Sequence, residues 1–444
     1  MNAPTLSVQQ LRRVVLAAAV GNVIEWYDFY IFGSLAAILS VQFFERSHPV
    51  AALLNTVALF SVGFLIRPLG AFVFGRIGDL VGRKYTFLVT LTGMGLSTAL
   101  IGVIPNYAHI GLMAAILLFV LRLVQGLCLG GEYGGAITYV AEHVPDERRG
   151  YFTGWLQTSP TLGIVVSLAV IISTRSMLGQ ESFNAWGWRV PFLLSLVLVA
   201  IAIYIRLRLQ ETPIFQAIKA SGRTSVNPWR EAFLGPNIKY VLIACIVAIG
   251  EGCVWYSSQF WALYFLQTVK HVEVLASSLI VGAALLVAAP TLVLFGALSD
   301  RVGRKPVILA GFLLAALTYY PLYSALGRAA EANAINYPLA ILIVAVLVSY
   351  VGMVYGPIAA FLAEYFPAHI RYTSVSVPYH IGNGWGGGLV PIITTAAFLR
   401  TGSLGSALVY PIVVPLVAFV LCVFLMPETR RMRIWVQEDL PARP

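Results

Sequence analysis

Charged residues are scarce in this sequence. Of its 444 residues, 59% are hydrophobic and 11% are charged, whereas soluble domains usually carry about a quarter charged residues. A soluble fold of this length needs a polar surface that this composition cannot supply. The scarcity therefore excludes an ordinary soluble protein and favours a chain surrounded by lipid, in which one span needs about 20 apolar residues.

Metal, redox and enzyme signatures are missing as well. Cys128, Cys245, Cys253 and Cys422 all lie in apolar segments without metal-ligand spacing, and the six histidines show no ligand pattern. The sequence contains no Walker loop, no HExxH and no GxSxG motif. We therefore expect no metal, no cofactor and no enzymatic activity.

The balance of charge is basic, with a net charge of +10 and a pI of about 9.5. The basic residues do not form a stripe with interleaved aromatics, so a nucleic-acid partner is not expected. They lie between apolar runs, and most of them fall on one side if both termini and the central loop are cytoplasmic. We expect that orientation in the inner membrane of a bacterium.

Twelve apolar runs separated by short polar segments can be read along the chain. The longest gap, residues 207–237, is polar and basic and predicts a cytoplasmic central loop with an amphipathic helix. The predicted organisation is an N-terminal six-helix bundle (1–206), this loop, and a C-terminal six-helix bundle with a short cytoplasmic tail (238–444). The predicted fold class is an all-α membrane protein with twelve transmembrane helices.

An internal repeat relates the two halves. Residues 75–84 read GRIGDLVGRK and residues 296–305 read GALSDRVGRK. A Glu and an Arg seven positions apart also recur, as Glu142 with Arg149 and as Glu364 with Arg371. Two motifs that recur at nearly one offset predict pseudo-symmetric bundles, an arrangement in which transporters place a substrate site between the repeats.

The GRIGDLVGRK segment resembles the loop between the second and third spans of the major facilitator superfamily, and its copy fits the loop after span eight. Glycines there permit a tight turn, and the aspartate can accept hydrogen bonds at a helix N-terminus. In that family the loop holds one conformation closed, although a charged turn that only sets topology would fit too. The resemblance assigns a conformational latch to Gly75, Asp79, Gly82, Arg83, Glu142, Arg149, Asp300, Arg304, Glu364 and Arg371.

Further strings narrow the resemblance to one branch. GNVIEWYDFYIFG (21–33), RPLGAFVFG (67–75), RLVQGLCLGGEYGG (122–135) and QETPIF (210–215) are similar to the metabolite:proton symporters. The resemblance implies a fold of two six-helix bundles around a central cavity that opens alternately to each side. It also implies a functional monomer and solutes that are organic acids or zwitterions such as proline and betaine.

Ionisable residues inside the N-terminal spans are the main candidates for function, because each is costly in hydrocarbon. Glu25 and Asp28 share a broad face of span one, and Arg122, Gln125 and Glu132 share a face of span four. We predict that the two carboxylates of span one face Arg122. The resemblance places an acid of span one and the arginine of span four at the coupling centre.

Asp28 and Arg122 are thus the predicted coupling pair, and a permanent structural salt bridge is the alternative. Protonation of Asp28 would release Arg122, whose planar guanidinium suits a substrate carboxylate. Proton and anionic substrate would then favour the same conformation, and reciprocal coupling follows by linkage. Glu25 and Glu132 are further proton-coupling candidates, with helix packing as the alternative for Glu132.

Substrate-binding candidates come from both halves. Arg67, before Pro68 in span two, could bind a substrate or only the carbonyls near the proline. Glu251 is not part of the pattern of the branch and could be specific to this chain. His380 could titrate near neutrality or simply pack. The full predicted set is Arg122, Arg67, Tyr27, Gln125, Glu251, Tyr256, Gln259, Tyr379, His380 and Asn383.

The sequence thus predicts proton-coupled uptake of a small organic solute, most readily a mono- or dicarboxylate, by alternating access. Its expected partners are the solute, protons and the bilayer. Two alternatives stay open. A sugar-porter-like symporter or uniporter would share the fold and the Glu–Arg motifs, and a membrane sensor that transports nothing would belong to another class.

Overall fold

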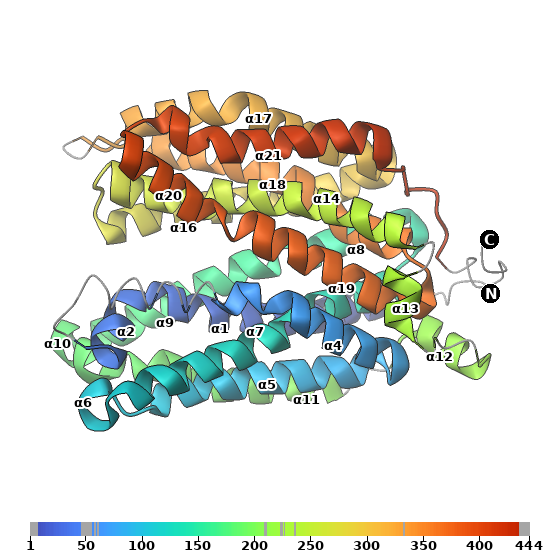
Figure 1. The fold of residues 1–444 in the computed structure, drawn as a ribbon, viewed down its shortest axis with the longest axis horizontal. Helices are drawn as coiled ribbons and strands as arrows, with labels where there is room; N and C mark the ends of the chain where they lie inside the picture. Colours follow the sequence, from blue (N-terminus) through green and yellow to red (C-terminus); the bar gives the residue numbers. More distant parts are fainter. Residues whose placement is uncertain are drawn as a thin grey trace.

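The structure is a computed structural model that describes residues 8–45, 56, 59, 62–207, 211–222, 225, 227–234, 237–331 and 334–434. Within these residues the regular structure is entirely helical. The helices form two bundles, one from each half of the chain, which lie one above the other in Figure 1.

The N-terminal bundle contains helices from α1 to α11. Short breaks at glycine and proline residues divide several of its spans into consecutive pieces. Its elements are α1 (Val8–Ser34), α2 (Ala36–Phe43), α4 (Arg67–Leu80), α5 (Arg83–Val103), α6 (Tyr107–Ile110), α7 (Leu112–Ala141), η1 (Asp146–Arg148), α8 (Arg149–Leu156), α9 (Ser159–Leu178), α10 (Gln180–Ser182), η2 (Phe183–Gly187) and α11 (Arg189–Leu207).

The C-terminal bundle contains helices from α14 to α21, and π-helical turns interrupt two of its spans. Such turns are frequent at functional sites. Its elements are α14 (Ile238–Tyr256), η3 (Ser257–Trp261), α15 (Ala262–Tyr264), η4 (Phe265–Val269), α16 (Val274–Val302), α17 (Arg304–Ala329), α18 (Tyr337–Tyr365), η5 (Ala368–Ile370), α19 (Arg371–Ile381), η6 (Gly382–Gly387), α20 (Val390–Thr401) and α21 (Leu404–Leu425).

Between the bundles, α12 (Pro213–Ala220) and α13 (Pro228–Phe233) lie in the central connection. Thr212 and Asn227 cap their N-termini with side-chain oxygens, and a proline follows each cap, as is favoured at a helix start. The buried residues of α12 are all apolar, so this helix is amphipathic.

Nine described helices are long and apolar enough to cross a membrane, and the bent pair Gln180–Gly187 with Arg189–Ile205 makes a tenth. Two further transmembrane segments complete the twelve-helix fold. One ends in α4, and the other runs through α19, η6 and α20. The predicted fold class is confirmed.

The two ends of the molecule differ. The end that carries α12 and α13, where α1 begins and α21 ends, is called the α12 end below, and the opposite end, which carries α6, is called the α6 end. Near the α12 end the bundles contact one another at two places: α8 packs against α16 and α18, and α19 packs against α4 and α7.

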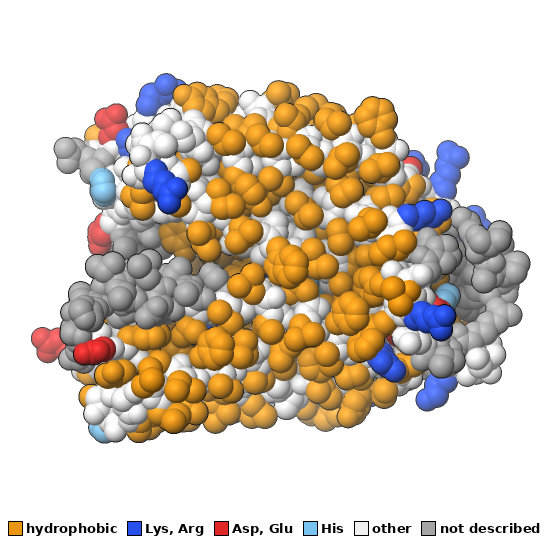
Figure 2. Space-filling view, in the orientation of Figure 1, with side chains coloured by type: hydrophobic (Ala, Val, Ile, Leu, Met, Phe, Trp, Pro, Cys, Tyr) orange, Lys and Arg blue, Asp and Glu red, His pale blue; other side chains and the backbone are white. Residues whose placement is uncertain are grey.

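The face seen in Figure 2 carries a broad hydrophobic area in its middle. The charged side chains gather at the two ends of this face. Large apolar side chains are exposed on several spans, among them Leu100, Leu294, Leu342 and Val420, each at least 47% exposed. A water-soluble protein rarely exposes such a continuous apolar surface. The surface is that of a chain embedded in lipid.

Candidate functional site: two latches and a central charged cluster

The first latch joins α4 of the N-terminal bundle to α19 of the C-terminal bundle. The Asp79 carboxylate accepts hydrogen bonds from the backbone amides of Tyr372 (3.2 Å) and Thr373 (2.9 Å) and from the Thr373 hydroxyl (2.8 Å). These amides belong to the first turn of α19, where unpaired N–H groups and the helix dipole favour a negative charge. Arg83 adds a bond from Nη2 to the Ala368 carbonyl (2.8 Å).

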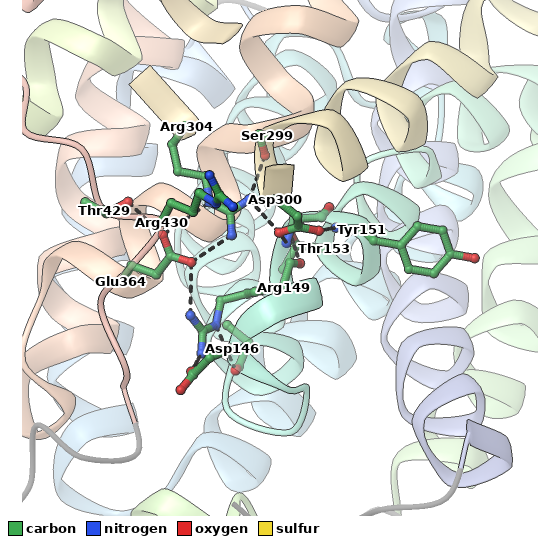
Figure 3. Close-up of polar contacts among 12 residues, drawn as sticks. Asp146, Arg149, Tyr151, Thr153, Ser299, Asp300, Arg304, Glu364, Thr429 and Arg430 are labelled. Carbon is green, nitrogen blue, oxygen red and sulfur yellow. Dashed lines mark hydrogen bonds and ion pairs between the residues drawn. The ribbon is translucent and has the colours of Figure 1, made fainter. Parts of the chain in front are cut away.

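The second latch repeats this arrangement with the halves exchanged (Figure 3). The Asp300 carboxylate accepts hydrogen bonds from the backbone amides of Gly150 and Tyr151, both at 2.8 Å, at the start of α8. Arg304 donates to Asp300 (2.6 Å) and to Ser299 (2.7 Å). Each repeated aspartate therefore caps a helix that belongs to the other bundle.

Ion pairs between the bundles accompany both caps. Arg371 Nη1 donates to Glu142 Oε1 (2.8 Å), which also lies 3.7 Å from Arg83. In the copy, Arg149 Nη1 donates to Glu364 Oε1 (2.9 Å), and Arg304 Nη2 donates to the same oxygen (2.9 Å). The two Glu–Arg motifs thus pair crosswise, each glutamate with the arginine of the other half.

The structure adds two Glu–Thr dipeptides to the latches, Glu211–Thr212 and Glu428–Thr429, which the sequence analysis did not link to them. Thr212 donates to Glu142 and Thr429 donates to Glu364, each at 2.6 Å. Glu211 accepts from the Lys84 amide (3.2 Å), and Glu428 accepts from the amides of Arg304 (2.9 Å) and Lys305 (3.0 Å). The strings QETP and PETR were the available signal, because both place Glu–Thr after a sixth span of each half.

These groups define the two latches by name. The Asp79 latch consists of Asp79, Arg83, Glu142, Glu211, Thr212 and Arg371, and the Asp300 latch consists of Asp300, Arg304, Glu364, Glu428, Thr429 and Arg149.

Glycines make the close approach possible. A methyl group on Gly75 would lie 2.9 Å from Thr373 Cα, and Gly82, at the turn after α4, has φ of +137°. Gly303 occupies the matching turn with φ of +116°. Positive φ values of this kind are readily adopted only by glycine, which accounts for the glycines in both copies of the repeat.

The central helices cover the Asp79 latch. Phe215 of α12 lies under the Arg83 guanidinium at 4.3 Å, and Trp229 of α13 donates its indole N–H to the Phe72 carbonyl (2.8 Å). Glu231 of α13 approaches His369 of η5 at 3.1 Å. Burial lowers the pKa of His369 below its ordinary value, and the Glu231 carboxylate only partly offsets that effect.

A second group of polar side chains lies midway between the ends, starting with Asp28 on α1. Its carboxylate accepts a hydrogen bond from Ser195 of α11 (2.5 Å) and lies beside Thr98 of α5, whose hydroxyl donates to the Met94 carbonyl of its own helix (3.0 Å). The Thr98 hydroxyl accepts from Gln125 (2.7 Å), and Gln125 Oε1 accepts from Arg122 Nη1 (2.9 Å). Thr98 and Gln125 thus form a polar relay from the neighbourhood of Asp28 to Arg122, in which the step from Asp28 to Thr98 is a close approach and not a hydrogen bond.

The predicted direct contact between Asp28 and Arg122 is wrong in this structure. Thr98 and Gln125 stand between the two charges, and the Arg122 guanidinium lies over the ring of Phe32 at 4.1 Å. The reason is that Ser195 of α11 donates to the Asp28 carboxylate, while Gln125 accepts from Arg122.

Arg67 lies at the interface between the bundles and is 2% exposed. Its guanidinium lies 4.2 Å from the centre of the Phe64 ring and 4.6 Å from that of Phe29, and it is within electrostatic range of Glu25 and Tyr256. Its Nε and Nη2 atoms have no hydrogen-bond partner among the described residues. Buried polar groups are normally hydrogen-bonded, so these donors are available to a ligand.

Glu251 of α14 lies in the other bundle and shares two neighbouring tyrosines with Arg67. It is fully buried, and Asn383 of η6 approaches its two oxygens at 3.3 and 3.5 Å. Tyr256 and Tyr379 interact electrostatically with both Arg67 and Glu251, so these two tyrosines neighbour both charges. No ion pair joins Glu251 to a described cationic side chain.

The remaining predicted residues divide between the interface and the bundle interiors. Gln259 of η3 is buried, and its Oε1 has no partner among the described residues. His380 lies 5.1 Å from the Tyr379 ring. Glu132, by contrast, accepts from Thr90 of α5 (2.8 Å), and Tyr27 donates to the Pro191 carbonyl (2.7 Å), so both side chains reach other helices of the N-terminal bundle. We drop Tyr27 from the substrate set.

Aromatic pairs between the bundles were missed by the sequence interpretation. Ring centres of Trp26 and Trp255 are 5.7 Å apart, those of Tyr30 and Phe260 are 5.9 Å apart, and those of Phe64 and Tyr256 are 5.5 Å apart. Tyr30 and Phe260 lie farther along α1 and η3 towards the α6 end than Glu25 and Glu251 do. The bundles are therefore in contact on both sides of the charged groups.

We call Arg67, Arg122, Glu25, Asp28, Glu132 and Glu251 the central charged cluster; all six are buried. No group of three or more His, Cys, Asp or Glu side chains within the described part of the chain has the geometry of a metal site. The cluster can bind protons and charged solute groups, and nothing in its donor set points to a metal.

Comparisons with known proteins agree with this architecture. The family described as Sugar (and other) transporter matches residues 14–226, and the Major Facilitator Superfamily matches residues 255–442. The proline/betaine transporter of Salmonella typhimurium is 33% identical over 84% of this chain and 75% of its own length. The shikimate transporter of Escherichia coli is 33% identical over 88% of this chain and 89% of its own length.

A solved structure shares the fold. The proton:xylose symporter XylE bound to 6-bromo-6-deoxy-D-glucose superposes with a TM-score of 0.80 and 17% identity, over 98% of this chain and 99% of XylE. The relatives and the matched fold are those of membrane transporters, not enzymes. This chain belongs to the major facilitator superfamily, in the branch of the metabolite and proline/betaine transporters.

Proposed function

We propose that the protein takes up a small carboxylate-bearing solute together with protons, by alternating access. The observation that carries this proposal is the composition of the central charged cluster, in which four carboxyl groups are buried together with only two guanidinium groups. A buried carboxylate without a compensating charge is costly, so the excess carboxyl groups must take up protons or a cationic ligand. Proton binding at the cluster follows from this imbalance.

Asp28 is the proposed coupling residue, and it acts through the relay to Arg122. As a carboxylate, it accepts a hydrogen bond from Ser195 and lies beside Thr98, whose hydroxyl donates to the Met94 carbonyl. Once protonated, it can donate to the Thr98 hydroxyl oxygen and so compete with the hydrogen bond that this oxygen accepts from Gln125. Because Gln125 in turn accepts from Arg122, this change reaches the Arg122 guanidinium. Glu25 and Glu132 are the further proton-accepting groups in the proposal.

The relatives narrow the solute. Proline, betaine and shikimate each carry a carboxylate, the group that a guanidinium binds through two parallel hydrogen bonds. A zwitterion adds no net charge to a cluster already rich in carboxyl groups, whereas a dicarboxylate adds two negative charges. We therefore favour a zwitterion of the proline or betaine type over the mono- or dicarboxylate that the sequence suggested.

The proposed setting is the bacterial inner membrane, with the α12 end in the cytoplasm and the monomer as the functional unit. Lys and Arg side chains on the connections at the α12 end, such as Lys84, Lys219 and Arg301, support this orientation. In the structure the two latches close that end, and solute then enters from the α6 end after the aromatic pairs separate.

Asp28→Asn tests the coupling in proteoliposomes that contain purified protein. The wild type accumulates labelled proline or glycine betaine when an inwardly directed proton gradient is imposed, and unlabelled xylose does not compete. Asp28→Asn loses the accumulation but keeps solute exchange in the absence of a gradient, because its relay no longer titrates. Linkage of this kind typically amounts to about 1–3 kcal/mol.

Glu181→Gln, at an exposed position of α10, is the matched control and retains gradient-driven uptake. Undiminished gradient-driven accumulation by Asp28→Asn would falsify the coupling role. Competition by xylose and not by any carboxylate would instead favour the sugar-porter alternative.

A further inference from the structure

We infer that Glu251 and Asn383 form the subsite for the cationic end of the solute, while Arg67 binds its carboxylate from the opposite bundle. This inference rests on the proposed function and assigns a specificity-determining residue within the same site. Its consequence is that a zwitterion bridges the two bundles, so both must close on the same molecule.

The position of Glu251 is the first argument. It projects from α14 of the C-terminal bundle, is fully buried, and receives only an amide contact from Asn383. In the described part of the chain no Lys, Arg or His side chain forms an ion pair with it. Burying a carboxylate in such surroundings is costly unless a cation or a bound proton compensates its charge.

The relation between Glu251 and Arg67 is the second argument. Tyr256 and Tyr379 are within electrostatic range of both side chains, so the two opposite charges have the same pair of tyrosines as neighbours. Arg67 presents Nε and Nη2 without a partner among the described residues. A solute with a carboxylate at one end and an ammonium group at the other has the matching polarity.

The surrounding rings are the third argument. Trp26 and Trp255 lie 5.7 Å apart between the bundles, and Trp255 also lies 4.9 Å from Tyr256. Faces of tryptophan and tyrosine attract cations, and cages of such rings recognise quaternary ammonium groups. The rings flank the Glu251 side of the interface, because Trp255 and Tyr256 follow Glu251 by about one helical turn.

The alternatives for Glu251 differ in what they predict. If Glu251 is purely structural, its substitution weakens the binding of all solutes by disturbing the fold. If Glu251 is a proton carrier, its substitution reduces the gradient-driven uptake of all solutes equally. A cation subsite acts only on solutes that carry a positive charge. The ratio between a charged solute and an uncharged isostere therefore separates these roles.

The test measures binding to purified protein of two matched pairs of ligands: glycine betaine against 3,3-dimethylbutanoate, and proline against cyclopentanecarboxylate. Each pair has the same shape, and only one member carries the nitrogen. We expect the wild type to prefer the zwitterion by at least about tenfold. Glu251→Gln should abolish or invert that preference, Glu251→Asp should retain part of it, and the exposed Glu331→Gln should leave it unchanged.

The outcomes also separate this inference from the proposed function. If wild-type protein binds both members of a pair equally, or if Glu251→Gln weakens both in the same proportion, the cation subsite is refuted while uptake of carboxylates stands. If none of the four ligands binds wild-type protein that retains its thermal unfolding transition, the proposed solute class and the subsite both fail.

Discussion

The Asp79 latch and the Asp300 latch have the same hydrogen-bond pattern but differ in what fills the space beside it. The residue after Arg371 is Tyr372, whose hydroxyl donates to the Gly131 carbonyl (2.6 Å) and whose ring fits against Gly78 and Gly135. The residue after Arg149 is Gly150, and the backbones of α8 and α16 come into direct contact there.

Their surroundings differ too. The Asp79 latch is covered by α12 and α13, and the Asp79 side chain is 1% exposed. The Asp300 latch borders a cavity of about 340 Å³, whose lining includes Asp146, Arg430 and Arg433. One latch is thus sealed by a side chain and two helices, and the other relies on backbone contact and a dense ion network. The comparison teaches that a repeated motif can keep its bonds while its packing diverges.

The largest expected effect separates the two glutamates at the centre of each latch. Glu364 accepts hydrogen bonds from Arg149, Arg304 and Thr429, whereas Glu142 accepts them, within the described part of the chain, from Arg371 and Thr212 only, with Arg83 at the longer distance of 3.7 Å. Glu364→Gln removes the shared charge from two buried guanidinium groups, a change that typically costs about 3–5 kcal/mol. We expect it to open the α12 end more than Glu142→Gln does.

Hydrogen exchange of the backbone amides followed by mass spectrometry checks this difference. Glu364→Gln should accelerate exchange in the peptide that starts α8, where Gly150 and Tyr151 donate to Asp300. Glu142→Gln should act more on the start of α19. Equal acceleration of exchange in both peptides by both variants would show that the two latches open as one unit, and the predicted difference between Glu364 and Glu142 would be wrong.

A smaller effect is expected from adding one methyl group at the backbone contact. The Cβ of Gly150→Ala would lie 2.3 Å from the Gly296 carbonyl oxygen, whereas that of Gly75→Ala would lie 2.9 Å from Thr373 Cα. Overpacking of this kind costs about 1–3 kcal/mol. Gly150→Ala should therefore slow solute exchange more than Gly75→Ala in proteoliposomes, and the reverse order would contradict the packing described for the Asp300 latch.

The smallest effect concerns pH at the cover of the Asp79 latch. Because burial lowers the pKa of His369, the closed arrangement binds this proton less readily than an arrangement with His369 exposed. The stabilisation is therefore present above the ordinary histidine value of about 6.5 and declines as the pH falls below it. Arg83 and Arg371 act in the same direction, and Glu231 opposes them.

His369→Gln should remove this component from the pH dependence of hydrogen exchange at the start of α19, after correction for the intrinsic exchange rate. The Asp300 latch has Glu147 and no histidine at the position that corresponds to His369, so the start of α8 serves as the internal reference. Identical pH profiles for wild type and His369→Gln would show that His369 contributes nothing.

Much of the latch geometry could be predicted from the sequence, because the spacing of the residues is the same in both copies of the repeat. GRIGDLVGRK and the Glu–Arg motifs recur at offsets that identify matching positions. The crosswise pairing of Glu142 with Arg371 was beyond the sequence, since it depends on how the bundles face each other. So was the difference between Tyr372 and Gly150, which sequence analysis treats as two unrelated residues.

The central charged cluster was predicted less well. Helical periodicity placed Asp28 and Arg122 on faces of their own spans, but it could not reveal that Ser195 would bind the Asp28 carboxylate and that Gln125 would bind the Arg122 guanidinium. Sequence analysis pairs one charged residue with another, because charged residues are easy to recognise in an apolar span. Neutral hydroxyl and amide groups, which are common in every span, decided the contact in the structure.

The aromatic pairs escaped prediction for a related reason. Trp26 and Trp255 belong to different halves, and each by itself resembles an ordinary packing residue of an apolar helix. Their importance arises only where the two bundles meet. Sequence reasoning works within a helix and between repeated motifs, and it fails where unrelated residues meet across the interface.

The most direct measurement is the distance between spin labels on the two bundles at each end of the molecule. Tyr85→Cys with Val302→Cys reports on the α12 end, and Leu112→Cys with Tyr337→Cys reports on the α6 end; all four positions are exposed or partly exposed on their helices. Adding solute at acidic pH should lengthen the first distance and shorten the second, and Glu364→Gln should lengthen the first without solute. If the distance at the α12 end changes neither with solute nor with Glu364→Gln, the account is contradicted, because the latches would then not hold that end closed.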